Sequence, residues 1–172
     1  MRSEKGFSLP EMVVLLALVA MLTTVTITFA LPWLAREDMR AAAYQVQMHL
    51  QIARIQAVNR NRSCRFQVDA VTSQVQVFDL NDPADGTDDI ELANFTLPDT
   101  VSFADPLGGA PITLALLAGN TYQATFASDG SVSAGAGTIA LSGGERFDRI
   151  TLYGAGGVKT ETWDGSSWVT GS

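Results

Sequence analysis

The chain has 172 residues, 47% of them hydrophobic and 17% charged, which suits one modest domain with an appendage. Seven basic and four acidic residues give residues 1–62 a charge of +3, whereas four basic and fourteen acidic residues give residues 63–172 a charge of −10. So acidic a body repels nucleic acid and anionic lipid unless a local basic patch overrides it. Cys64 is the single cysteine, which excludes an intrachain disulfide, and it is expected to be a small, half-buried residue at a strand start.

Residues 12–35 form an uncharged, apolar run that predicts a membrane-spanning helix. A helix of about 24 residues reaches about 36 Å, more than the hydrocarbon core of about 30 Å. The run is too long for the apolar part of a cleaved secretory signal. The basic residues Arg2 and Lys5 before it predict a cytoplasmic N-terminus, so residues after 36 would lie outside the cytoplasm.

Residues 37–59 lack Gly and Pro and predict a second helical stretch with two apolar stripes. The small stripe comprises Ala42, Val46, Leu50, Ala53 and Ala57, and the bulky stripe comprises Tyr44, Met48, Ile52, Ile55 and Val58. We expect the bulky stripe to face the core of its own domain and the small stripe to approach another helix. The alternative is that one domain buries both stripes. His49, the single histidine, is expected on a solvated flank.

After Arg62 the pattern changes to the alternation of apolar and polar residues that is typical of strands. The candidate strands are CRFQVDA, SQVQVFDL, and residues 91–97, 100–104, 113–117, 121–127, 137–142, 149–153 and 157–163. Turn-rich separators such as SDGS and LSGGE favour an antiparallel arrangement. Near the end, a hairpin turning at Asp164–Gly165 would bring Trp163 and Trp168 face to face, the alternative being two unpaired surface aromatics.

The predicted fold class is therefore α+β, with a long N-terminal helix packed on an antiparallel β-sheet or small β-sandwich domain. Enzyme signatures are absent, because one histidine and one cysteine leave no Cys–His pair and no metal-ligand cluster. The pattern Gly135-x-Gly137-x-x-Ala140 precedes a predicted strand, whereas a dinucleotide loop precedes a helix. We expect no enzymatic activity, no cofactor and no metal.

Two charged clusters flank the start of the predicted sheet. The acidic segment 79–91 contains Asp79, Asp82, Asp85, Asp88, Asp89 and Glu91. Oxygen-rich loops can hold calcium, but the spacing does not fit an EF-hand, so a solvated acidic turn is expected and calcium stays an open alternative. The basic cluster Arg60, Arg62 and Arg65 could touch phosphate, or could simply favour the C-terminal end of a helix dipole.

The segment GFSLPE, residues 6–11, followed by an apolar helix resembles the leader motif of type IV pilins and pseudopilins. In that family a prepilin peptidase cuts after a glycine on the cytoplasmic side and methylates the new N-terminal amine. The resemblance implies that Gly6 precedes the cut and that Phe7 becomes N-methylphenylalanine. It also implies that Glu11 is an assembly contact that neutralises the Phe7 amine of a neighbouring subunit. Pro10 stands where an aliphatic residue is more usual, and proline suits an early helical position.

Three later stretches, ARIQAVNRNRSCRFQVD, ATFASDGSVSAGAGTIALS and DRITLYGAGGVKTETW, resemble the GspH/FimT family. The resemblance implies a minor pilin-like structural subunit of a type II secretion pseudopilus, anchored by a single pass in the inner membrane with a periplasmic C-terminal domain. Its implied partners are other pilin or pseudopilin subunits, met through the N-terminal helix, together with the prepilin peptidase and membrane lipid. The implied division is a leader over 1–6, a transmembrane helix over 7–35, an amphipathic helix over 36–62 and a β domain over 63–172.

The alternative is a FimT-like minor type IV pilin involved in pilus biogenesis or DNA uptake. Some members of that group bind DNA through an arginine-bearing C-terminal segment. Here the C-terminal stretch KTETWDGSSWVTGS has Lys159 as its only basic residue. The arginines that bind DNA in those members therefore have no counterpart in this chain. Nucleic acid is not an expected partner.

Overall fold

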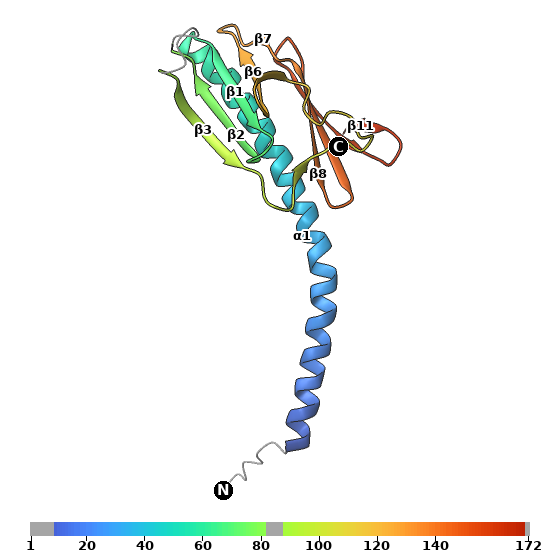
Figure 1. Cartoon of the computed structure of the whole chain (residues 1–172). Coiled ribbons are helices and arrows are strands. Elements are labelled where there is room, and N and C mark those ends of the chain that lie inside the picture. The colour runs from blue at the N-terminus through green and yellow to red at the C-terminus, as the bar shows by residue number, and fades with distance from the viewer. Residues whose placement is uncertain (1–8, 82–87, 171–172) are drawn as a thin grey trace. The chain divides into compact units, whose positions relative to one another are not determined.

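The computed structural model describes residues 9–81 and 88–170, and the side chains of all of these except 25–33 and 35 (Figure 1). Helix α1 spans Leu9–Arg60, and β-strands follow it. The chain divides into two compact units, Met1–Leu34 and Ala35–Ser172. The α+β class predicted from the sequence is confirmed, with antiparallel sheets packed against the helix of the second unit.

Helix α1 ends where its sequence supplies a cap. Asn61 follows Arg60 with φ of 52°, a left-handed conformation that asparagine adopts more readily than most residues. The Asn61 N–H donates to the Val58 carbonyl, and the Arg62 N–H donates to the Ala57 carbonyl, both at 3.2 Å. This pair of bonds satisfies carbonyls that the end of the helix leaves without partners and turns the chain into the first strand.

The first sheet has the order β3-β2-β1-β6-β5, with β7 also paired to β6. Its strands are β1 (Cys64–Asp69), β2 (Gln74–Asp79), β3 (Ile90–Thr96), β5 (Ala115–Ala118), β6 (Thr121–Phe126) and β7 (Val132–Ala134). Burial alternates strictly along β1 and β2, as their sequences predict. Between them the Asp69 carboxylate accepts from the Val71 and Thr72 N–H groups at 2.8 and 3.0 Å, which closes the turn.

The second sheet has the order β11-β10-β9-β8-β4, and its pairs are antiparallel. Its strands are β4 (Ser102–Phe103), β8 (Gly137–Gly143), β9 (Arg146–Leu152), β10 (Val158–Trp163) and β11 (Trp168–Thr170). The Gly135-x-Gly137 pattern thus leads into β8 and not into a helix, as predicted. A Cβ added at Gly135 would lie 2.1 Å from the Gln123 carbonyl oxygen, so this glycine permits close approach to β6.

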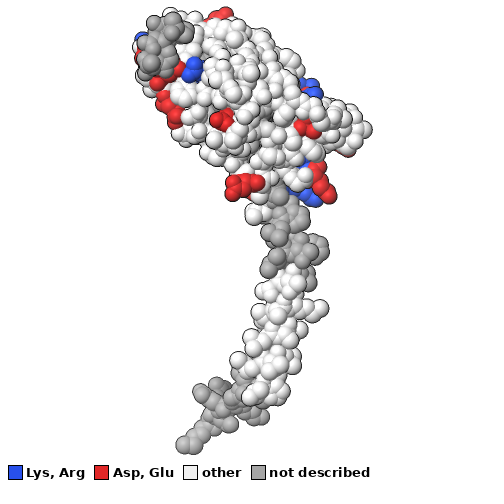
Figure 2. Space-filling model, in the orientation of Figure 1, with Lys and Arg blue, Asp and Glu red and all other residues white. Residues whose placement is uncertain are grey.

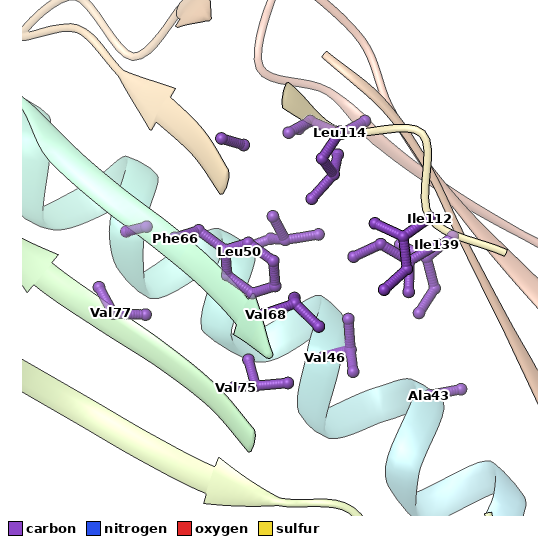
Figure 3. Packing of buried hydrophobic residues seen from close by; sticks show 14 of the residues in the cluster. Ala43, Val46, Leu50, Phe66, Val68, Val75, Val77, Ile112, Leu114 and Ile139 are labelled. Carbon is purple, nitrogen blue, oxygen red and sulfur yellow. The ribbon is translucent and has the colours of Figure 1, made fainter. Parts of the chain in front are cut away.

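One hydrophobic cluster joins α1 to both sheets (Figure 3). The helix contributes its small stripe, and Ala42, Val46 and Leu50 are fully buried there. The first sheet contributes large side chains such as Phe66 and Phe126, which fill the space that the small helical residues leave. Of the bulky stripe, Ile52 is partly buried against this cluster, whereas Tyr44, Ile55 and Val58 are exposed. The expectation that the stripe as a whole faces the core is therefore wrong, because the strands supply much of the volume of the core.

His49 is also placed differently from the expectation. Its side chain is buried against Phe95, with ring centroids 5.9 Å apart, and its Nδ1–H donates to the Gln45 carbonyl at 2.7 Å. A bond to the preceding turn satisfies one ring nitrogen inside the protein, so burial of this polar side chain costs little. His49 thus has a packing role in the core, and the solvated position predicted for it is wrong.

Candidate assembly site

The first described part of α1 presents apolar side chains to its surroundings over all of its faces. The exposed fractions are 80% for Leu9, 67% for Leu16 and 70% for Met21, and the large residues between them are also about half exposed or more. Soluble monomers seldom expose a continuous apolar surface of this kind, so such a surface marks an interaction site. Within the residues that the structure describes, no helical segment is long and apolar enough to qualify as a membrane span.

Two of the residues that the leader motif singles out, Gly6 and Phe7, lie outside the described residues. The third, Glu11, lies in the first turn of α1 and is exposed. A carboxylate at this end of a helix interacts favourably with the positive end of the helix dipole. Glu11 is the single acidic residue among the otherwise uncharged residues 9–35.

The helical part of the second unit has an exposed ridge on the side opposite the core. Tyr44, Met48, Gln51, Ile55 and Val58 follow one another at alternating intervals of four and three residues, the spacing of a helix–helix contact seam. Tyr44, Ile55 and Val58 are 66%, 54% and 48% exposed. The alternative in which one domain buries both stripes is therefore also wrong. Neither sheet covers this ridge, because both sheets pack against the small stripe on the other side of the helix.

The basic cluster after the helix is committed to contacts within the domain. Arg60 donates to Asp79 at 2.6 Å, Arg65 is paired with Asp89, and Arg62 is bonded to Asn81. The side chains of Asp79 and Asp89 are 1% and 5% exposed. Buried carboxylates of this kind need such partners, because an unpaired buried charge is strongly unfavourable.

The acidic segment therefore differs from the solvated turn that the sequence predicts. Asp79 and Asp89 are buried in the ion pairs just described, and Glu91 accepts from the side-chain amides of Gln76 and Asn94. Among the residues that the structure describes, no group of three potential metal ligands comes together. Asp82 and Asp85 lie outside the described residues.

Cys64 begins β1 and is fully buried, deeper than the half-buried position expected. Burial, and to a smaller extent the Asp79 carboxylate, raise the pKa of its thiol to about 11, against the opposing effect of the Arg60 guanidinium. The reactive form of cysteine is the thiolate. Cys64 is therefore a packing residue that is inert toward thiol reagents at neutral pH.

The C-terminal hairpin brings two tryptophans together, as predicted. Trp163 and Trp168 are directly opposite in the β10–β11 register, with ring centroids 5.3 Å apart in an edge-to-face arrangement. The Arg149 guanidinium lies over the Trp168 ring, 4.4 Å from its centroid, and also donates to Glu161 at 2.8 Å. The Asp164 carboxylate closes the turn by accepting from the Ser166 and Ser167 N–H groups at 2.8 and 2.7 Å.

We expect acid to loosen this hairpin. The backbone hydrogen bonds from Ser167 and Ser166 lower the pKa of Asp164 from 3.8 to about 2. Since the folded pKa is depressed, the stabilisation is present above pH 3.8 and is lost as the pH falls toward 2. In a Trp33→Phe background, tryptophan fluorescence should change between these pH values.

The matched variant Asp164→Asn keeps a side-chain oxygen that can accept the same turn bonds but does not titrate. It should lack the fluorescence change between pH 4 and 2 that the acid form produces. If the asparagine variant showed the same transition, another group would be responsible.

Comparison with known proteins identifies the family. Residues 42–156 match the protein family described as Type II transport protein GspH, which covers more than half of the chain. The chain belongs to this family. The matched region contains the last 19 residues of α1, the whole first sheet, and strands β4, β8 and β9 of the second sheet. The resemblance to the GspH/FimT family noted from the sequence is confirmed.

Solved structures of two proteins share the fold of this GspH-family chain. The type IV minor pilin FimU of Pseudomonas aeruginosa is 14% identical, with a TM-score of 0.52, over 77% of this chain and 93% of that one. The minor pseudopilin EPSH from the type II secretion system of Vibrio cholerae is also 14% identical, with a TM-score of 0.52, over 81% of this chain and 98% of that one. A comparison with curated proteins finds no match.

Sequence reasoning missed the exposed ridge as a surface, although all of its residues except Gln51 were named in the bulky stripe. The alternating intervals of four and three residues were a signal that could have found it. It also missed a shallow groove beside the ridge, lined by Gln51, Arg54, Ile55, Val58 and Asn59. The size of the side chains in two helical stripes does not predict which stripe faces outward, because the sheets can supply the large residues of the core.

Proposed function

We propose that this GspH-family chain is a minor pseudopilin, a structural subunit of an inner-membrane-anchored type II secretion pseudopilus that acts in protein secretion. The observation that carries the proposal is the apolar surface around residues 9–24, whose large side chains are about half exposed or more. Such a surface suits membrane lipid before assembly and the helices of neighbouring subunits after it. The exposed ridge on the second half of α1 would extend the contact to those subunits.

We further propose that processing prepares this helix for assembly. A prepilin peptidase would cut between Gly6 and Phe7 on the cytoplasmic side and methylate the Phe7 amine, and residues 7–35 would cross the inner membrane. The domain would then lie in the periplasm, where its charged side chains meet water (Figure 2). The Glu11 carboxylate would neutralise the Phe7 amine of a neighbouring subunit, because a charge within the membrane costs about 2.5–3.5 kcal/mol on insertion scales unless it is paired.

The alternative role, a FimT-like minor type IV pilin in pilus biogenesis or DNA uptake, has less support from the domain. The cations of the second sheet are paired: Arg146 with Asp148, and both Arg149 and Lys159 with Glu161. A phosphate backbone would have to displace these carboxylates while approaching a domain with a charge of −10 over residues 63–172. A gel-shift assay of the full-length chain in detergent at low salt should show no retained DNA.

Replacing Glu11 with alanine should leave cleavage largely intact and impair incorporation into the filament. A contact that contributes about 1.4 kcal/mol to assembly changes the assembly equilibrium tenfold. Because pairing of a charge within the membrane should contribute at least that much, we expect incorporation to fall tenfold or more. The measurement is the amount of the chain that copurifies with other pseudopilins, together with the secretion of a reporter protein. The control is Glu37→Ala, at an exposed acidic residue later in α1. Incorporation of Glu11→Ala at the level of the unsubstituted chain would remove this role.

A further inference from the structure

Arg54 lies at the edge of the exposed ridge and lines the groove on its flank. Its groove neighbours include the exposed apolar residues Ile55 and Val58 and the amide side chains Gln51 and Asn59. Arg54 is half-buried, and it contributes to the lining of this open, partly apolar groove. Arginine is one of the residues enriched in protein interfaces, and exposed apolar side chains beside it add surface that a partner can bury.

Two turns of the domain hold the stem of Arg54 in place. A Cβ added at Gly130 would lie 3.2 Å from Arg54 Nε and 3.1 Å from Val58 Cγ2, and one added at Gly156 would lie 3.0 Å from Arg54 Nε. Both glycines have positive φ, 80° and 78°, and approach each other so closely that a Cβ at Gly156 would meet the Gly130 carbonyl oxygen at 2.1 Å. The two turns therefore fit around the arginine, which limits its rotamers and prepares the guanidinium for a partner.

Arg54 differs from most of the described cations of the domain in having no carboxylate partner. Ion pairs with carboxylates engage Arg60, Arg65, Arg146, Arg149 and Lys159. Within the described ranges 9–81 and 88–170, no carboxylate lies within 4.0 Å of Arg54, and it takes part in none of the side-chain hydrogen bonds. A half-buried guanidinium gains most from a charged acceptor, because its donors match a carboxylate in a two-pronged geometry.

We propose that Arg54 receives a carboxylate from a neighbouring pilin-like subunit of a different kind, whose side chain lies over Ile55 and Val58. This rests on the proposed function, in which the neighbours of a minor subunit are mainly subunits of other kinds and not copies of this chain. The apolar residues beside Arg54 suit an aliphatic stem ending in a carboxylate, as in Asp or Glu of a protein. A polyanion such as nucleic acid would be repelled by the acidic domain around the groove.

Two substitutions test the contact in cells that express the full chain with its native partners. Arg54→Met keeps the stem that Gly130 and Gly156 contact and removes the charge, whereas Arg54→Glu reverses it. We expect copurification with other pseudopilins to fall about tenfold for the methionine variant and further for the glutamate variant. The control Arg62→Glu makes the same change in net charge at an exposed arginine bonded to the neutral Asn81, and should assemble normally.

A reversal scan then identifies the partner residue. In the Arg54→Glu background, each Asp and Glu of the other pilin-like subunits, and of this chain for comparison, is changed to Lys. One change in another subunit should restore copurification at least tenfold. Normal assembly of Arg54→Glu, absence of rescue anywhere in the scan, or rescue only by a reversal within this same chain would each overturn the proposal. If the chain with Arg54 itself failed to copurify, the proposed function would fail, whereas normal copurification of Arg54→Glu removes only this contact.

Discussion

A chain carrying Gly6→Ala is expected to keep its first six residues and to fail in assembly. The family resemblance places the scissile bond after Gly6, and an added methyl group at that position obstructs a peptidase that accepts glycine. A rise of about 1.4 kcal/mol in the barrier already slows cleavage tenfold, so processing should fall by at least that factor. Mass spectrometry of the chain from membranes would distinguish the two forms, because the intact form would retain Met1 and the proposed processed form would begin at a methylated Phe7.

The loss of assembly has its own physical reason. Without cleavage the nitrogen of Phe7 remains part of a peptide bond, so it carries no charge for Glu11 to neutralise. The control is Ser3→Ala, which changes a small residue of the leader away from the scissile bond and should be processed normally. Full processing of Gly6→Ala together with normal secretion would contradict both the cleavage site and the pseudopilin role.

Replacing Phe66 with alanine is expected to destabilise the domain by about 3–5 kcal/mol, the usual cost of removing a buried phenylalanine. Phe66 is fully buried in β1, between Val77 of β2 and Ala124 of β6 in the strand register. Its ring fills the space over the small helical stripe. The short alanine side chains of that stripe cannot reach into the cavity that the substitution would leave. Urea unfolding of the full-length chain in detergent, followed by tryptophan fluorescence, gives the change in the free energy of unfolding.

The matched control for Phe66→Ala is Leu116→Ala. Leu116 lies on the edge strand β5 and is 62% exposed, so its truncation should change the free energy of unfolding by less than about 0.5 kcal/mol. Equal effects of the two substitutions would mean that the cluster joining α1 to both sheets does not hold the domain together.

Local patterns in the sequence were sufficient for much of this fold. The change from helical to alternating periodicity after Arg62 predicted the helix end and the first strands, because burial on one face imposes each period directly. The Trp163–Trp168 pair was predictable for a similar reason, since a short hairpin fixes its own register. The strand β7 is only three residues long, which is too short for an alternating pattern to predict it.

Contacts between distant segments could not be read from the sequence. Arg60 and Asp79 are 19 residues apart and Arg65 and Asp89 are 24 apart, so nothing local marks these acids as buried partners and not as a solvated turn. The outward orientation of the bulky stripe depends on the volume that Phe66 and the other strand residues bring to the core. The groove at Arg54 depends likewise on Gly130 and Gly156, which arrive from turns far along the chain.

The burial of Cys64 has a practical consequence for mapping the neighbours of this subunit. With a thiol pKa of about 11, roughly one molecule in ten thousand carries the thiolate at pH 7, and that sulfur is enclosed by the core. A cysteine introduced at an exposed position such as Ile55 would then be the one thiol available for oxidation in the otherwise natural chain. Disulfide trapping in the periplasm could therefore record which subunit faces the ridge, without first removing the native cysteine.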